Sequence, residues 1–146
     1  MLEKIKNVLL ELGSGFTFVG NQYKITVGDK DYYLDLLFYH LKLRCYIIIE
    51  LKAKEFILEY AGKMNFYISA IDDMLKTKYD NSIIGIILVK NKDKINVEYS
   101  LRNIENPIGV SSYELSKYLP KDVLELLPTE EELNLHININ DNMEER

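Results

Sequence analysis

Three charged residues stand inside stretches of the chain that are otherwise apolar. Asp35 lies within the run Tyr32 to Tyr39, while Glu50 and Lys52 end the apolar run that starts at Arg44. Burying a charge in such a run is costly unless the charge has a partner or binds a metal ion. Two carboxylates that converge on one point would form a hard oxygen site suited to Mg²⁺ or Mn²⁺. A nearby lysine could then position a water molecule or offset charge on a phosphoryl group, which is the chemistry of phosphodiester hydrolysis.

The three side chains can meet only if their strands pair with the right parity. Side chains alternate along a strand, so Glu50 and Lys52 share one face. If a two-residue turn follows His40, Asp35 lies opposite Ile48 and diagonally from Glu50 on the same face. A four-residue turn keeps this parity, whereas a three-residue turn puts Asp35 on the other face unless a bulge corrects it. The alternative reading of the three charges is an internal ion-pair network.

The spacing of apolar residues predicts the elements that would carry these side chains. Helical spacing predicts a first helix over residues 2–12, and the longest helix from Glu59 to about Lys78. Alternating or continuous apolar runs predict strands over residues 22–27, 32–39, 44–51, 82–89 and 95–101. Residues 106–109 break the chain, and short helical pieces are expected over 113–119 and 123–127. This order predicts an α/β fold with a mixed central sheet of about five strands flanked by helices.

Length and charge indicate one domain followed by an acidic tail. The chain has 146 residues, 47% of them hydrophobic, which matches ordinary globular usage. Its net charge of -5 is concentrated in residues 129–146, which contain six acidic residues and one basic residue, Arg146. Residues 1–128 are therefore neutral overall. We therefore expect a domain over residues 1–128 and a partly disordered C-terminal tail over residues 129–146. A neutral domain neither supports nor excludes binding to a polyanion, since a local basic rim can suffice.

The sequence favours a cytoplasmic protein without a membrane partner. Its N-terminus lacks the basic and apolar regions of a secretory signal, and no apolar run approaches the length of a membrane span. The single cysteine, Cys45, stands in an apolar run where a buried, inert thiol is expected. A reducing compartment fits these observations.

Asp35 followed by Glu50-Leu51-Lys52 resembles the Asp then Glu-X-Lys signature of the PD-(D/E)XK nuclease superfamily. More specific sequence motifs accompany this signature: Leu-Gly-Ser-Gly-Phe-Thr-Phe-Val-Gly at 12–20, Asp-Leu-Leu-Phe-Tyr-His at 35–40, Ile-Glu-Leu-Lys at 49–52, Glu-Tyr-Ala-Gly at 59–62 and Asn-Pro-Ile-Gly-Val at 106–110. Over roughly residues 9–133 the chain is therefore similar to the C-terminal domain of the YhcG-type (DUF1016) bacterial proteins. The resemblance implies a restriction-endonuclease-like core.

The resemblance also implies a role for each residue of the signature. Asp35, Glu50 and Lys52 would be catalytic, and Mg²⁺ or Mn²⁺ would be held by Asp35, Glu50 and the carbonyl group of Leu51. Superfamily nucleases often draw another acid from the first helix, and Glu11 occupies that position here. On an amphipathic helix, Glu11 could equally be a solvated surface residue.

Candidate substrate-binding residues lie on either side of the signature. RecB-type relatives carry a Gln, three residues and a Tyr on the helix after Glu-X-Lys, where this chain has Lys63 and Tyr67. Tyr67 matches this pattern, whereas Lys63 departs from it and could contact a phosphate instead. Gln22 could approach the substrate or be a surface hydrogen-bonding residue. A basic phosphate rim could be formed by Lys42, Arg44, Lys54 and Lys63.

Together, these observations predict a Mg²⁺-dependent endo- or exonuclease that acts on nucleic acid, with DNA expected ahead of RNA. The resemblance implies that longer family members carry an N-terminal helical, DNA-contacting module, which we do not expect in this chain. A homodimer is a further expectation, since dimers are common in the superfamily that the chain resembles. The alternative is a catalytically silent module that keeps the nuclease fold and binds nucleic acid or protein, which the neutral domain and the acidic tail favour.

Overall fold

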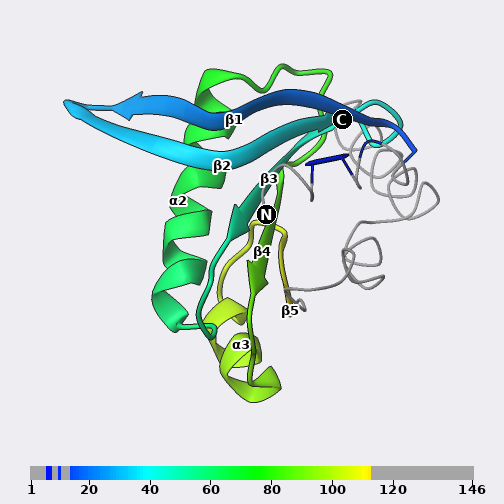
Figure 1. Cartoon of the computed structure of the whole chain (residues 1–146). Helices are drawn as coiled ribbons and strands as arrows, with labels where there is room; N and C mark the ends of the chain where they lie inside the picture. Colours follow the sequence, from blue (N-terminus) through cyan, green and yellow to red (C-terminus); the bar gives the residue numbers. More distant parts are fainter. Residues whose placement is uncertain (1–5, 8–9, 11–13, 113–146) are drawn as a thin grey trace, which may run out of the picture.

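The computed structural model describes residues 6–7, 10 and 14–112, and these form a mixed five-stranded sheet with two helices on one face (Figure 1). The elements, in chain order, are β1 (Phe16–Val27), β2 (Lys30–His40), β3 (Cys45–Leu51), α2 (Leu58–Met74), β4 (Ile84–Val89), α3 (Lys94–Leu101) and β5 (Ile108–Ser112). The strands lie in the sheet in chain order. The pairs β1–β2 and β2–β3 are antiparallel, while β3–β4 and β4–β5 are parallel. The predicted α/β fold with a mixed sheet is confirmed.

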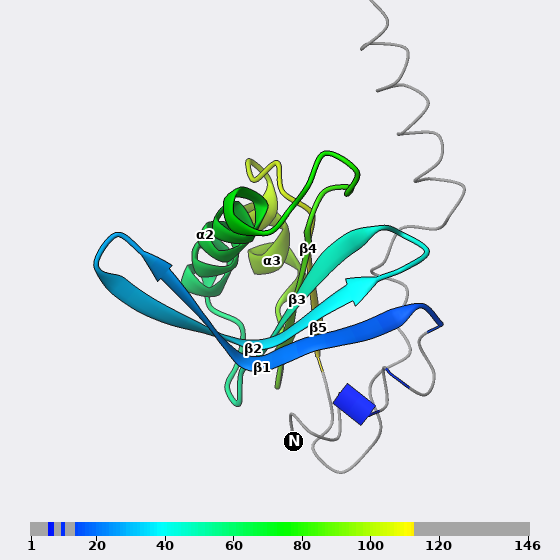
Figure 2. The same cartoon turned by 90° about the horizontal axis from the view of Figure 1, so that it is seen from above.

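The hairpin of β1 and β2 is much longer than the strand beside it. Its pairing runs from Phe16–His40 to Val27–Lys30, with a register shift between Phe18 and Gly20. Strand β3 pairs with β2 only as far as Leu36, opposite Ile49. Within the described part of the chain, residues 21–35 thus form a two-stranded ribbon, which we call the arm. The arm projects beyond the sheet and, seen from above, curves toward the side that carries α2 (Figure 2).

The sheet buries apolar side chains on both faces. The cluster under α2 includes Ile48, Met64, Ile68, Ile71 and Ile87, and the cluster on the other face includes Phe38, Ile47, Ile49 and Ile86. Strand β2 changes sides partway along, because Leu34 and Leu37 both join the α2 cluster while Leu36 joins the other. Two-stranded ribbons twist strongly, which accounts for the change. Asp35 lies at this changeover.

Helix α2 lies close to the sheet over Gly85 of β4. A Cβ atom at Gly85 would lie 2.6 Å from Cγ of Met64 and 3.0 Å from Cδ1 of Ile68. Glycine is therefore needed for this approach of helix and strand. None of the helices among the described residues is long and apolar enough to cross a membrane.

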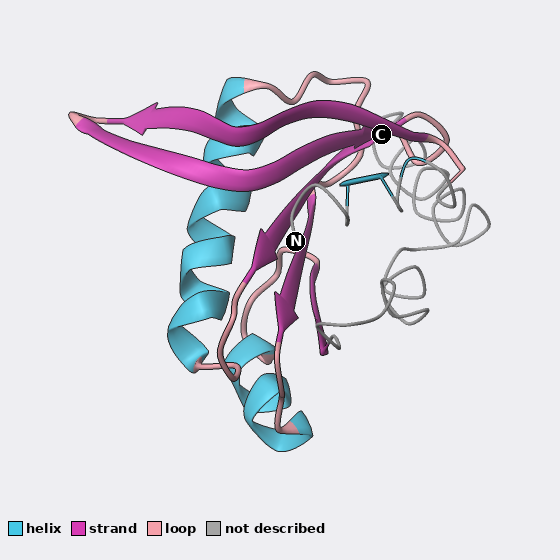
Figure 3. Ribbon diagram, in the orientation of Figure 1, coloured by secondary structure: helices cyan, strands magenta, loops and turns pink. Residues whose placement is uncertain are grey.

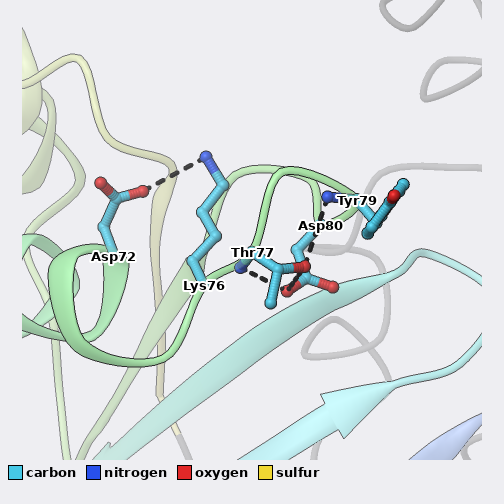
Figure 4. Close-up of polar contacts among 5 residues, drawn as sticks. All are labelled: Asp72, Lys76, Thr77, Tyr79 and Asp80. Atoms are coloured by element: carbon cyan, nitrogen blue, oxygen red, sulfur yellow. Dashed lines mark hydrogen bonds and ion pairs between the residues drawn. The ribbon is translucent and has the colours of Figure 1, made fainter.

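The loop after α2 is tied to the turn between β2 and β3. Asp80 accepts hydrogen bonds from the Tyr39 hydroxyl and from the Thr77 amide, the latter at 2.9 Å. The Asn81 side chain donates to the Leu43 carbonyl at 2.8 Å. Figure 4 shows the Asp80 carboxylate beside Thr77, and Asp72 paired with Lys76. Burial opposes ionisation of Asp80, but the hydrogen bonds from Tyr39 and Thr77 outweigh it and lower the pKa of Asp80.

Two of the predicted elements are wrong. Residues 95–101, predicted as the fifth strand, belong to helix α3, and the fifth strand is β5, where a chain break was predicted (Figure 3). Asp93 caps α3 by accepting hydrogen bonds from the amides of Ile95 and Asn96 at 2.8 and 3.3 Å. The predicted pieces at 113–119 and 123–127, the tail at 129–146 and most of the first helix lie outside the described residues.

Candidate active site

The register of β2 and β3 brings Asp35 and Glu50 together. Four residues separate the paired His40 and Cys45, so the four-residue turn is the one that the structure contains. The last printed pair is Leu36 with Ile49, so the next residues, Asp35 and Glu50, lie opposite each other. A two-residue turn would instead have placed Asp35 opposite Ile48. The Asp35 Oδ2 atom accepts a hydrogen bond from the Leu51 amide at 2.8 Å. Asp35 is thereby fixed against β3 beside Glu50.

Glu50 is the buried member of the carboxylate pair. Only 5% of Glu50 is exposed, and no hydrogen-bond partner among the described residues satisfies its Oε1 atom. Burial raises the pKa of Glu50 to about 8, and the hydrogen bond and negative charge of Asp35 act in the same direction. The positive charge of Lys52 acts against this shift. The pair therefore suits either a shared proton or a bound cation.

The donor set at this point fits a hard divalent cation. An unpartnered buried carboxylate oxygen is costly, and a cation that also contacts Asp35 would satisfy it. Among the described residues, no group of three or more Asp, Glu, His or Cys side chains is placed to hold a metal ion. The described part of the site therefore offers two carboxylates and backbone oxygens, and Glu11 lies outside the described residues.

Lys52 lies on the same face as Glu50, directly after the end of the central strand β3. Its backbone amide donates to the Leu88 carbonyl at 2.8 Å, which holds it at the end of β3 beside β4. Its Nζ atom lies 5.2 Å from the centre of the Tyr60 ring. Lys52 as a residue is half-buried, and its positive charge is close enough to act on Glu50.

Helix α2 forms the wall opposite the charged residues. Glu50, Lys52 and Ile87 line one side of a small cleft, and residues at helical spacing line the other: Tyr60, Lys63, Met64 and Tyr67. Tyr67 is 3% exposed, and burial together with the charges of Glu50 and Asp35 raises the pKa of its hydroxyl to about 12. The Lys63 Nζ atom lies 5.8 Å from the Tyr67 ring centre. The structure thus brings Lys63 and Tyr67 to the same cleft as Glu50 and Lys52.

Gln22 is held in a rare backbone conformation next to Asp35. Its φ angle is +46°, in the left-handed region that side chains other than glycine seldom adopt. The flanking pairs, Asn21–Leu36 and Tyr23–Leu34, place Gln22 opposite Asp35. Its amide donates to the Asp35 Oδ1 atom at 3.3 Å. The sequence predicted Gln22 as a substrate contact or a surface hydrogen-bonding residue. It gave no sign that the partner would be Asp35, because the predicted strand began only at residue 22.

Part of the expected phosphate rim lies elsewhere. Lys42 and Arg44 are in the turn before β3, whereas Glu50 is near the other end of that strand. At about 3.3 Å per residue, roughly 20 Å separates Arg44 from Glu50, so neither turn residue borders the cleft. Lys54 follows β3 directly, and its carbonyl accepts a hydrogen bond from the Lys90 amide at 3.0 Å.

Comparison with known proteins identifies related sequences and folds. The family model described as YhcG PDDEXK nuclease domain matches residues 1–128. The Escherichia coli (strain K12) protein named "Putative nuclease YhcG" is 32% identical over 115 residues, which is 79% of this chain and 31% of that protein. The chain thus spans about a third of the length of this curated relative.

Solved structures of low sequence identity share the fold. A repair endonuclease from Pyrococcus abyssi superposes with a TM-score of 0.56 at 15% identity, covering 78% of this chain and 47% of that chain. A structure of EndoMS in complex with double-stranded DNA gives a TM-score of 0.56 at 14% identity, covering 79% and 45%. These similarities show a restriction-endonuclease-like core.

Proposed function

Since the chain belongs to the YhcG PDDEXK nuclease domain family, we propose that it hydrolyses phosphodiester bonds of nucleic acid with Mg²⁺ or Mn²⁺ as cofactor. The observation that carries this proposal is the pair of carboxyl groups at Asp35 and Glu50, with one buried oxygen of Glu50 left without a partner. DNA is the first substrate to test, because one structural neighbour is bound to double-stranded DNA.

Each residue of the site has a defined part in this reaction. Asp35, Glu50 and the Leu51 carbonyl would hold the cation, which would supply positive charge to the phosphoryl oxygens and lower the pKa of a bound water molecule. The Leu51 amide and Gln22 keep the Asp35 carboxylate in place. Lys52 orients the attacking water and stabilises the charge that develops on the phosphoryl group. Lys63 contacts a neighbouring phosphate, while Tyr67 packs behind Glu50 and limits its access to water.

The test compares cleavage by the wild type with cleavage by a Lys52→Ala variant. Labelled DNA and RNA, both single-stranded and duplex, are incubated with Mg²⁺ or Mn²⁺. We expect the wild type to cut and the variant to lose about 10²–10³-fold in kcat, as when one electrostatic stabiliser is removed. Lys78→Ala is the control, since Lys78 is exposed beyond the far end of α2 and should leave cleavage unchanged. Equal cleavage by wild type and Lys52→Ala would reject the role given to Lys52.

A catalytically silent binding module is the second candidate. It is favoured by the donor set, since the described residues bring two acidic side chains rather than three to the site. Calorimetric titration with Mn²⁺ separates the two proposals. Binding that Asp35→Asn abolishes supports the nuclease, whereas no binding together with a tight, metal-independent complex with DNA supports the module.

A further inference from the structure

The ring of Tyr60 stands beside Lys52 in the cleft. Both side chains line the cleft together with Glu50, and the Lys52 Nζ atom lies 5.2 Å from the centre of the Tyr60 ring. A cation within about 6 Å of the centre of an aromatic ring is attracted by the negative face of that ring. Lys52 and Tyr60 are both half-buried, so water screens this attraction only in part. The ring is therefore one of the groups that hold the Lys52 ammonium group.

Contacts on two sides fix the place of the Tyr60 ring. Tyr60 lies in the first turn of α2, where its amide donates to the Ile57 carbonyl at 3.1 Å. Its ring meets the ring of Phe56 edge-on, with 6.3 Å between the ring centres. The Phe56 amide in turn donates to the Asn91 carbonyl at 2.9 Å, which ties this segment to the chain after β4. The ring is thus held both by the helix and by the segment that follows β3.

Lys52 has an acidic neighbour as well as this aromatic one. Its positive charge is close enough to Glu50 to act against the raised pKa of that carboxyl group. The two neighbours affect a lysine differently, because a carboxylate offsets its charge and repels a phosphate, whereas a neutral ring attracts the ammonium group and leaves its charge in place. Glu50 is also a proposed ligand of the cation. Tyr60 is therefore the neighbour that can hold Lys52 while Lys52 keeps its full charge toward a phosphate.

We propose that Tyr60 is a positioning residue for Lys52: the face of its ring holds the ammonium group where it meets the phosphoryl group, an inference that rests on the proposed nuclease function. The contact needs the ring and not the hydroxyl group. A phenylalanine at position 60 therefore serves as well as the tyrosine. An aliphatic side chain at position 60 lets the long side chain of Lys52 sample further rotamers, so the ammonium group spends less time at the reacting phosphate.

The kinetic test uses the nucleic acid that the wild type cuts. Tyr60→Leu should lower kcat about tenfold and leave KM unchanged, because Lys52 acts on the transition state. Tyr60→Phe should keep kcat close to wild type. In a Lys52→Ala background, Tyr60→Leu should have no further effect, since the ring acts through Lys52. Tyr79→Leu is the control with unchanged kcat: the Lys78 Nζ atom lies 5.1 Å from the Tyr79 ring centre, but this pair follows the far end of α2.

A second measurement is independent of cleavage. In proton–carbon NMR spectra of the intact chain with isotope-labelled lysine, the ring current of Tyr60 should shift the ε-methylene protons of Lys52 upfield, and Lys52→Ala identifies this signal by its loss. Tyr60→Leu should move the signal to the position of exposed lysines, and Tyr60→Phe should retain the shift. Tyr79→Leu should move the Lys78 signal alone. If Tyr60→Leu does not fold, Tyr60→Met takes its place, because methionine also lacks a ring and favours a helix.

The outcomes separate this inference from the proposed function. Equal kcat values for wild type and Tyr60→Leu would overturn the positioning role, and so would a Tyr60→Phe variant as slow as Tyr60→Leu. An effect of Tyr60→Leu that persists at full size with Lys52→Ala would also overturn it. A wild type that cuts nothing with Mg²⁺ or Mn²⁺ would contradict the nuclease. The Lys52 signal would then decide: an upfield shift lost in Tyr60→Leu would support the hold of Tyr60 on Lys52, and an unchanged signal would overturn it.

Discussion

The carboxyl group of Glu50 carries a proton in the folded, metal-free chain at pH values where an exposed glutamate has lost its proton. Burial raises its pKa from 4.5 to about 8, and the neighbouring Asp35 adds to the shift. Between these two pH values the folded state holds one more proton than the unfolded state. The free energy of unfolding contributed by this group is therefore fully present below pH 4.5 and is lost as the pH rises toward 8.

Replacing Glu50 with Gln should remove this pH dependence. A neutral amide of similar shape has no proton to lose. As the pH rises from 4.5 to 8 in EDTA, the free energy of unfolding of the variant should therefore increase by roughly 3–5 kcal/mol relative to that of wild type. Thermal denaturation across this range measures the difference. Glu105→Gln, at an exposed position, should follow the wild-type curve. Adding Mn²⁺ should stabilise the wild type and not Glu50→Gln, because cation binding replaces the proton. Parallel pH curves for wild type and Glu50→Gln would contradict the buried, protonated state.

Gln22 has a strained backbone and also donates a hydrogen bond to Asp35. A mutation can separate the effect of the strain from the effect of the hydrogen bond. Gln22→Gly should relieve the cost of a left-handed residue, about 1 kcal/mol, while removing the hydrogen bond to Asp35. We expect equal or higher thermal stability together with weaker Mn²⁺ binding. Arg44→Gly is the control, because Arg44 has a φ angle of +52° at the other end of β3. It should raise stability and leave Mn²⁺ binding unchanged. If Gln22→Gly binds Mn²⁺ as wild type does, Gln22 has no part in holding Asp35.

At the scale of elements, the contact between α2 and β4 depends on Gly85. A Cβ atom at this position would collide with Met64 and Ile68, so Gly85→Ala should lower the free energy of unfolding by about 1–3 kcal/mol through overpacking. The substitution should also shift Met64, which lines the cleft. Gly62→Ala is the matched control, because nothing lies within 4 Å of its Cβ position and alanine favours a helix by about 1 kcal/mol. Chemical denaturation should show opposite signs for the two variants. Equal effects would contradict the close packing over Gly85.

The helix α3 shows why local periodicity misled the prediction. Ile95, Val97, Tyr99 and Leu101 alternate as in a strand, but the same spacing contains two pairs four residues apart. In the helix, Val97 and Leu101 pack toward the α2 cluster, while Ile95 and Tyr99 remain exposed. The N-cap residue Asp93 was the available signal for a helix. Strand β5 was missed because Pro107 and Gly109 indicate a break, although an edge strand tolerates proline at its start.

At the scale of the whole molecule, the chemistry is confined to one end of the sheet. Glu50 and Lys52 stand at the end of β3 that faces the first turns of α2, while Arg44 and Asp80 belong to the opposite end. The fold class and the shared face of Asp35 and Glu50 could be predicted, because strand alternation survives any even-numbered turn. The misplaced phosphate rim could not be corrected from sequence, since residues close to Glu50 along an extended strand can be far from it in space.

The length of the arm is independent of the geometry of the carboxylate pair. Pairing with β3 ends at Leu36, so the positions of Asp35 and Glu50 are set by the three-stranded part of the sheet. Residues added or removed on both strands near the two-residue tip, Gly28 and Asp29, leave that register intact. The arm can therefore lengthen or shorten while the spacing between the two acidic groups stays the same.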